Sequence, residues 1–229
     1  MRVLALGAHP DDIEIYMFGA LAAWSGSGAS VHFGVATDGS KGGQGEPAEL
    51  AGTRRREAAA AAALLGADLH FLGFPDGELV PDGLLVGALK TLIGSVLPDV
   101  VLTHAPNDYH GDHRALSEAV RIASSFTAPV LHADTMHGVG FAPTYYVDVT
   151  AHFQLKARAI RAHVSQEPER FVTGMSQLNA LRAGQCNAPE GSFAEAFRFE
   201  PFFPFADIRG LLPPPPAVRP VHRHNVPWK

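Results

Sequence analysis

Short apolar runs alternate with helix-forming segments along the first half of the chain. Residues 3–8 form a continuous apolar run that ends in polar residues, which is typical of a buried strand in a parallel sheet. The same pattern predicts further strands over 31–37, 69–72, 100–103 and 144–149. Helices are predicted over 17–24, 47–65, 84–96, 113–125, 151–164 and 177–184. This alternation predicts an α/β fold: a Rossmann-like, doubly wound, mostly parallel sheet with helices on both faces.

The alternation loosens in the second half of the chain. With no internal repeat or linker in view, we expect a single domain over 1–229. Its parts are a βαβ core over 1–128, an irregular C-terminal cap over 129–200 and a proline-rich tail over 201–229. From Phe197 onward, prolines and phenylalanines dominate, which predicts extended polyproline structure.

Composition narrows the class of protein. The 229 residues are 46% hydrophobic and 18% charged, the balance of a globular chain, and the formal charge of −5 argues against a nucleic-acid-binding surface. The single cysteine, Cys186, cannot form an intramolecular disulfide, and no apolar run approaches the roughly 20 residues of a membrane span. We therefore expect a cytoplasmic globular protein.

Polar clusters follow each of the first four predicted strands. They occupy residues 9–12, 38–45, 76 and 108–113. Because ligands of a doubly wound sheet bind beyond the carboxyl ends of its strands, these clusters should meet at one rim. The glycine-rich cluster 38–45 lacks the spacing of the phosphate-binding motifs, so we interpret it as a mobile substrate loop.

The first cluster, His9-Pro10-Asp11-Asp12, has the residue types of a catalytic metal site. Proline favours a turn here, and the side chains of adjacent aspartates point in different directions. One carboxylate can then bind a metal while the other accepts a proton. The alternative is that Asp11 and Asp12 merely cap the next helix.

The second cluster brings two histidines and two aspartates into residues 107–113. Imidazole and carboxylate suit zinc, and a catalytic zinc site uses three protein ligands plus an open position. A solvated polar loop is the alternative for this segment by itself. Two such clusters at neighbouring strand ends favour the metal site. Ligand type does not distinguish zinc from other divalent first-row metals such as iron or cobalt.

Several short motifs follow one another over residues 3–200. They lie at 8–14, 54–57, 65–66, 72–77, 108–113, 141–143, 147–148, 165–166 and 193–197. In kind and order they resemble the LmbE-like, or PIG-L, family of zinc-dependent N-acetylglucosaminyl deacetylases. The pairing of the AHPDD and HxDH motifs carries most of this resemblance.

The resemblance implies a role for each matching residue. His9, Asp12 and His113 match the zinc ligands. Asp11 matches the general base that takes a proton from the zinc-bound water. His110 matches a histidine whose protonated ring stabilises the oxyanion or the leaving amine.

Three further residues are implied less directly. Arg54 and Asp76 match residues that line the substrate pocket, although Arg55 or Arg56 can compete for the first role. Asp112 matches a partner that orients a ligand histidine, as histidines in metal sites require.

The resemblance implies a hydrolase that removes acetyl from an N-acetylglucosamine-type sugar or conjugate, including the malate and inositol conjugates of thiol biosynthesis. It also implies a homo-oligomer, often a hexamer in this family, with an interface in the phenylalanine-rich C-terminal part.

Two other functions remain open. A divalent-metal phosphoesterase would need a phosphate clamp, which only the run 54–56 offers. A non-catalytic sugar-binding protein is the second, because Tyr16 and Phe18 stand where the family has small residues.

Among isolated residues, we interpret Cys186 as incidental and His104 as a possible wall of the cleft. His132 and His137 are weaker candidates, and His222 and His224 are interpreted as solvated.

Overall fold

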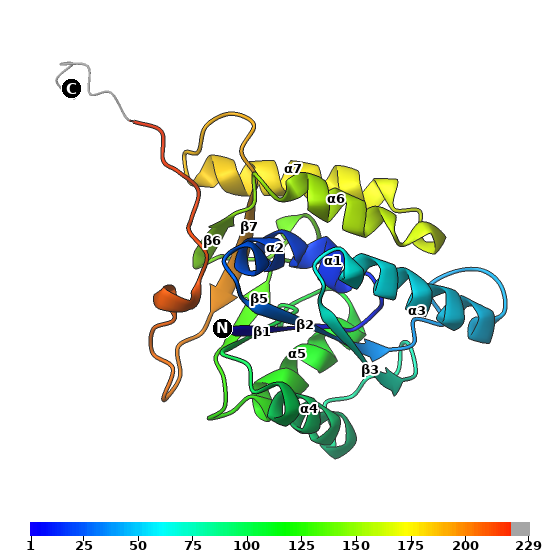
Figure 1. Cartoon of the computed structure of the whole chain (residues 1–229). Helices are drawn as coiled ribbons and strands as arrows, with labels where there is room; N and C mark the ends of the chain where they lie inside the picture. The colour runs from blue at the N-terminus through cyan, green and yellow to red at the C-terminus, as the bar shows by residue number, and fades with distance from the viewer. Residues whose placement is uncertain (221–229) are drawn as a thin grey trace.

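A mixed seven-stranded sheet forms the centre of the protein, in the order β3-β2-β1-β4-β5-β7-β6 (Figure 1). The computed structural model describes residues 1–220, so His222 and His224 lie outside it. The strands are β1 (Arg2–Gly7), β2 (Ser30–Thr37), β3 (Asp68–Phe74), β4 (Val100–Thr103), β5 (Val130–Ala133), β6 (Tyr145–Asp148) and β7 (Ala194–Phe199). Strands β1 to β5 pair in parallel, whereas β7 runs antiparallel to both β5 and β6. The mostly parallel α/β fold is confirmed.

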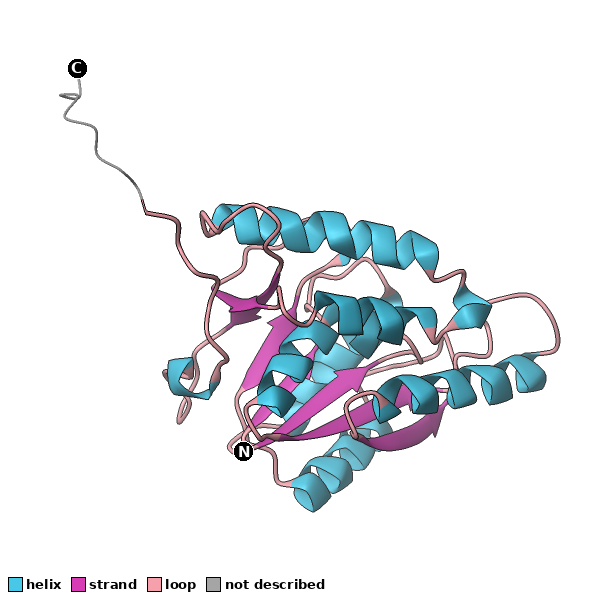
Figure 2. Ribbon diagram, turned by 45° about the horizontal axis from the view of Figure 1, so that its top comes forward, coloured by secondary structure: helices cyan, strands magenta, loops and turns pink. Residues whose placement is uncertain are grey.

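Helices cover both faces of this sheet (Figure 2). They are α1 (Asp12–Tyr16), α2 (Phe18–Gly26), α3 (Pro47–Ala63), α4 (Gly83–Val96), α5 (Gly111–Ala123), α6 (Phe153–Arg161) and α7 (Glu169–Gln185). Helices α4 and α5 cover one face, and the remaining helices lie on the other. None of the helices within residues 1–220 combines the length and apolar character needed to cross a bilayer.

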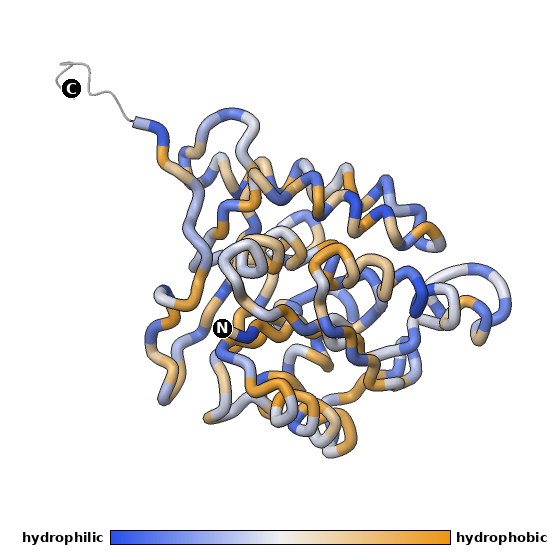
Figure 3. The backbone as a smooth tube through the Cα atoms, viewed as in Figure 1, coloured by the Kyte–Doolittle hydropathy of each residue, from blue (hydrophilic) through white to orange (hydrophobic). Residues whose placement is uncertain are grey.

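Two hydrophobic cores hold these layers together, one on each face of the sheet. Alternate residues of β1 point to opposite cores: Val3 and Ala5 pack with α2 and α6, while Leu4 and Leu6 pack with α4 and α5. Figure 3 shows the hydrophobic colouring concentrated along the central strands. Because both faces are covered, β1 reads as a continuous apolar run rather than an alternating one.

The C-terminal part is more regular than its sequence indicates. Strands β5 and β7 were not predicted, and the expectation of polyproline structure from Phe197 is wrong for the last residues of β7. Strand β7 carries a buried glutamate, Glu195, which obscures its apolar pattern. Glu195 accepts hydrogen bonds from the backbone N–H groups of Gly19 and Ala20 and pairs with the buried Lys156 at 2.6 Å. Contacts with Lys156 and the start of α2 thus offset the cost of burying this charge. A sequence pattern alone treats a charged residue as evidence against a buried strand.

The strand order determines where the site forms. From β1 the chain proceeds to β2 and β3 on one side, and then crosses to β4 on the other side of β1. Such a reversal leaves a crevice beyond the carboxyl end of β1, between the loops of its neighbours. The loops that follow β1, β2, β3 and β4 carry the polar clusters, and all of them reach this rim.

Candidate metal and substrate site

A pocket of about 380 Å³ opens at this rim, within the usual size range for small-molecule sites. Its polar floor contains His9, Asp11, Asp12, His110 and His113. The other lining residues are Ile15, Tyr16, Lys41, Gly42, Arg54, Asp76, Gly77, Tyr109, Met136, Gln166, Arg170 and Phe171. Loops far apart in the sequence therefore contribute to one cavity.

The carboxylate of Asp12 lies between two histidine rings. Its Oδ2 atom is 3.2 Å from Nδ1 of His9, and its Oδ1 atom is 3.3 Å from Nε2 of His113. His9 sits on the turn after β1, Asp12 is the first residue of α1, and His113 lies in the first turn of α5. The sheet therefore brings together the two predicted ligand clusters.

The outer nitrogen of each histidine faces a carboxylate. Nε2 of His9 lies 3.2 Å from both Asp76 Oδ1 and Asp112 Oδ2, and Nδ1 of His113 lies 3.0 Å from Asp108 Oδ1. Asp112 is itself held by the backbone N–H groups of Gly77 and Leu79. Histidines that bind metals commonly have such carboxylate partners, which set the tautomer and the ring orientation.

These distances fit a small divalent cation. Ligand atoms placed about 2.0–2.1 Å from a tetrahedral zinc ion lie about 3.3 Å from one another, close to the separations across Asp12. Burial alone lowers the pKa of both histidines, but Asp12 and the other carboxylates outweigh it, raising the pKa of His9 to about 12 and that of His113 to about 9. The cluster thus strongly attracts positive charge.

Ligand-type side chains at this floor form three overlapping groups, so a cation has several donors within reach. The groups are His9-His110-His113, Asp12-His104-His113 and His9-Asp76-Asp112. The predicted ligands His9, Asp12 and His113 are divided among these groups, and each histidine approaches a different oxygen of Asp12. His104 was only a candidate wall of the cleft, and it lies within the cluster. Its ring stacks on His113 at 3.7 Å, and its Nε2 atom accepts a hydrogen bond from the N–H of Ala8.

His132 contacts the backbone of His104 from outside the pocket. Its Nδ1 atom lies 2.9 Å from the backbone oxygen of His104, and neither His132 nor His137 lines the pocket.

Asp11 occupies an unusual backbone position beside His9, Asp12 and His113, which we call the metal-type cluster. Its φ of 147° is rare for a residue with a side chain, and its carboxylate makes no capping hydrogen bond although it precedes α1. The capping alternative therefore does not hold for Asp11. Burial raises the pKa of Asp11 to about 6 although the charge of Arg54 lowers it, so this carboxylate can accept a proton near neutral pH.

Of the three arginines at 54–56, Arg54 is the one that lines the pocket. Its Nη2 atom donates to Asp11 Oδ1 at 3.0 Å and to the backbone oxygen of Pro10 at 2.9 Å, and Nη1 donates to the oxygen of Gly39. Arg55 lies over the ring of Phe71 instead.

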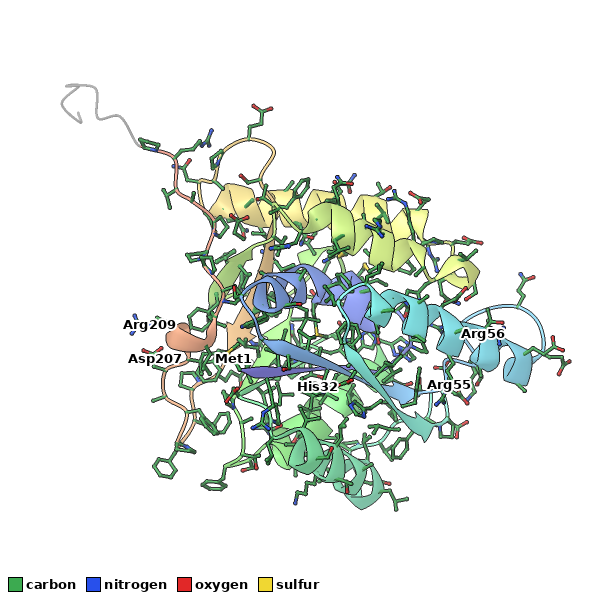
Figure 4. All side chains as sticks on the ribbon, viewed as in Figure 1. Met1, His32, Arg55, Arg56, Asp207 and Arg209 are labelled. Carbon is green, nitrogen blue, oxygen red and sulfur yellow. The ribbon has the colours of Figure 1, made fainter. Side chains whose placement is uncertain are left out.

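Arg56 bonds Thr53 on the exposed side of α3. Figure 4 labels Arg55 and Arg56 on this helix. Arg54 thus lines the pocket, as the resemblance implies, but its hydrogen bonds are made to the protein.

His110 projects into the same floor. Its ring centroid lies 4.7 Å from that of His9 and 4.8 Å from that of His113. Its Nδ1 atom accepts the backbone N–H of Asp112, which leaves the proton on Nε2. Burial, together with the charges of His9 and His113, lowers the pKa of His110.

Of the bulky residues 16–18, Met17 and Phe18 lie outside the pocket. Met17 and Phe18 are fully buried, and the Phe18 ring packs against Phe33 in the core. Tyr16 lines the pocket floor, with its ring edge toward His104 and His113. The argument for an obstructed site therefore does not hold for Phe18.

Sequence reasoning missed most of the pocket's walls. Tyr109, Met136, Gln166, Arg170 and Phe171 were given no site role, yet all of them line the cavity. Met136, Gln166 and the start of α7 come from the C-terminal part, whose fold was poorly predicted. The 165–166 motif was the one available signal, because it holds Gln166.

Comparisons with known proteins agree with this arrangement. Residues 4–124 match the PIG-L family, described as GlcNAc-PI de-N-acetylase. The diacetylchitobiose deacetylase of Thermococcus kodakarensis is 33% identical over 90% of this chain and 88% of its own. The 4-oxalmesaconate hydratase of Pseudomonas putida is 27% identical, over 72% of this chain and 73% of its own.

Solved structures extend the likeness to three dimensions. The N,N'-diacetylchitobiose deacetylase of Pyrococcus horikoshii superposes with a TM-score of 0.76 at 26% identity, covering 92% of this chain and 88% of that one. The chain therefore belongs to the PIG-L family of hydrolytic N-deacetylases, as its motifs predicted.

Proposed function

We propose that this protein is a metal-dependent hydrolase that removes the N-acetyl group from an N-acetylglucosamine-type sugar or conjugate. One observation carries the proposal: His9 and His113 flank Asp12 at metal-ligand spacing, and each has a carboxylate on its outer nitrogen. Diacetylchitobiose, the compound named for the Thermococcus and Pyrococcus relatives, is the first substrate to test. Small-sugar conjugates fit the same pocket by size.

We assign His9, Asp12 and His113 as the ligands of one divalent cation, with zinc as the first candidate. A cation held there polarises the amide carbonyl and lowers the pKa of water from 15.7 to about 7. Asp112 and Asp76 hold the His9 ring by its Nε2 atom, so that Nδ1, which faces Asp12, would be free to bind the cation. Asp108 does the same for His113 through Nδ1.

Asp11 acts as the general base. Its Oδ1 atom is held by Arg54, which leaves the second oxygen of the carboxylate to accept a proton from the attacking water. The same group can return that proton to the departing amine, because a leaving amine must be protonated before the C–N bond breaks. His110 donates from Nε2 to the oxygen that gains negative charge, and such a donor contributes about 10²–10³ in rate.

The rival functions have less support. The run 54–56, which the sequence offered as a phosphate clamp, does not provide one, because Arg54 donates to the protein and Arg55 packs on Phe71. A non-catalytic sugar-binding protein has no need for Asp11 in strained geometry or for an aligned base. Both features favour an enzyme.

The test joins metal analysis to a free-amine assay on purified protein. The panel contains diacetylchitobiose, N-acetylglucosamine, its malate and inositol conjugates, a sugar phosphate and 4-oxalmesaconate, each with and without chelator. Phosphate release and loss of 4-oxalmesaconate are measured alongside amine release. We expect about one metal per chain and chelator-sensitive amine release from at least one acetylated sugar. Metal binding with hydration of 4-oxalmesaconate alone would overturn the assignment, as would phosphate release from a sugar phosphate without amine release.

The assignment of Asp11 has its own test. Asp11→Asn should keep the metal and lose about 10²–10⁴ in turnover, the usual contribution of a general base. His113→Ala should lose metal and activity together. Full turnover by the Asp11 variant would remove this residue from the mechanism.

Two expectations concern the whole protein. We propose that the chain works as a homo-oligomer in the cytoplasm and that residues 1–229 form one domain.

A further inference from the structure

Gln166 is a nearly buried pocket residue outside the proposed metal-binding and acid–base set. Its exposed fraction is 6%, and it lines the pocket from the short 3-10 helix Val164–Gln166, which connects α6 to α7. Glu167 follows with a φ of 52°, so the chain turns sharply immediately after Gln166. The backbone therefore leaves the pocket after Gln166, while the amide side chain of Gln166 remains in the pocket wall.

A chain of hydrogen bonds from α3 holds the amide of Gln166. Glu57 accepts the backbone N–H of Ser165 at 2.8 Å through one oxygen and the Ser165 hydroxyl at 2.7 Å through the other. The single hydroxyl proton of Ser165 is thereby used, so its Oγ atom can only accept. Gln166 Nε2 donates to this Oγ at 3.0 Å.

These contacts determine which end of the amide is free. Because Nε2 must face Ser165, Oε1 is left on the side of the amide that lies near Gly42. A Cβ atom added at Gly42 would lie 3.3 Å from this oxygen, which places it at the wall formed by the 38–45 loop. No donor within residues 1–220 hydrogen-bonds to it. Oε1 is not one of the fully buried side-chain atoms that lack a partner, so it stays accessible in the pocket lining, where water or a ligand can supply the donor.

We propose that Gln166 Oε1 accepts a hydrogen bond from a ring hydroxyl of the substrate and so selects a sugar over other acetamides. The inference rests on the proposed deacetylase function. The acetamide oxygen is the group to be polarised at the metal-type cluster. Apart from the single amide N–H, the donors of an N-acetylated sugar are its hydroxyls. A site that hydrogen-bonds a substrate hydroxyl discriminates against analogues that lack it.

Gln166→Leu tests this role because leucine retains similar bulk but has no acceptor. The substrates are the acetylated sugar that the wild type cleaves best, its single-deoxy analogues, and N-acetylcyclohexylamine, which has no hydroxyl. We expect kcat/KM of the variant to fall about 3–10-fold for the sugar, the range for one neutral hydrogen bond. Activity on N-acetylcyclohexylamine should be unchanged, and one deoxy analogue should be cleaved equally by the wild type and the variant.

Controls separate this role from a structural one. Gln177→Leu changes an exposed glutamine on α7 and should leave every substrate unaffected. Metal content and circular dichroism report whether the Gln166 variant is folded, and calorimetry with the same sugars reports binding without turnover. An equal loss on N-acetylcyclohexylamine and the sugar would overturn the proposal, as would no loss on any substrate. If the wild type releases no amine from any sugar, the deacetylase assignment fails instead, and the proposal for Gln166 fails with it.

Discussion

Arg54 Nη2 donates a hydrogen bond to Asp11 Oδ1 at 3.0 Å, and both side chains are buried at the pocket floor. The same nitrogen also bonds the oxygen of Pro10, so one guanidinium holds both the carboxylate and the backbone before it. This pair links α3 to the turn after β1. It makes Arg54 a positioning residue for the proposed base.

Arg54→Lys should therefore reduce kcat while metal content stays unchanged. Lysine keeps the charge but cannot reproduce the planar donor geometry, and a small displacement of a catalytic group costs up to about 10²-fold in rate. Arg56→Lys on the exposed side of the same helix is the matched control. A variant whose kcat equals that of the wild type would show that Arg54 does not position Asp11.

Asp112→Asn tests the support of the proposed metal ligand His9. The Asp112 carboxylate lies 3.2 Å from His9 Nε2, and losing such a partner usually weakens metal affinity about 10–100-fold. Competition with a chelating indicator measures this affinity without any substrate. Asp99→Asn changes an aspartate at the opposite end of β1, which bonds the N–H of Arg2, and should leave the affinity unchanged.

The pH profile of kcat/KM reports the ionisation of Asp11, the proposed base. Asp11 accepts a proton only when ionised, so activity should fall about tenfold per unit below its pKa. Burial raises this pKa to about 6, and a bound cation favours the ionised form and lowers it. The acid limb should therefore lie at or below about pH 6. A limb centred well above pH 6 would point to a different ionising group.

His163, whose charge also acts on Asp11, links stability to pH. Burial lowers the pKa of His163, but the nearby Glu14, 3.4 Å from Nε2, raises it overall above its usual value. Protonated His163 therefore stabilises the fold fully below about pH 6.5, and this contribution is lost as pH rises through the higher folded-state pKa.

His163→Gln should then lower the free energy of unfolding more at pH 6 than at pH 9. Breaking a buried ion pair costs about 3–5 kcal/mol, so we expect a loss of that order at pH 6. Urea denaturation at both pH values measures the difference, with His152→Gln as a control at a position whose side chain makes no capping bond. An equal loss at both pH values would refute the linkage.

The expected oligomer has a testable surface. Phe126 and Phe203 are 72% and 83% exposed, and their ring centroids lie 6.3 Å apart. Exposed aromatic pairs of this kind favour association. Light scattering should show an assembly that the double variant Phe126→Ser with Phe203→Ser weakens. A monomeric wild type would exclude this expectation.

The sequence by itself determined the core and the chemical identity of the metal-type cluster. Apolar runs and helix-forming segments predicted β1 to β4 because parallel strands buried on both faces must be continuously hydrophobic. The cluster could be named because its residues lie in two short motifs, each next to a predicted strand end. Local pattern suffices when the relevant residues are neighbours in sequence.

Only the tertiary structure decided which partners these residues have. That Arg54 rather than Arg55 meets Asp11, and that Gln166 enters the pocket, depends on contacts between segments more than forty positions apart. Strand β7 likewise depends on Lys156 and the start of α2 to compensate buried Glu195. The physical reason is common to all three: side-chain direction and the neutralisation of buried charge depend on packing, which periodicity along the chain does not encode.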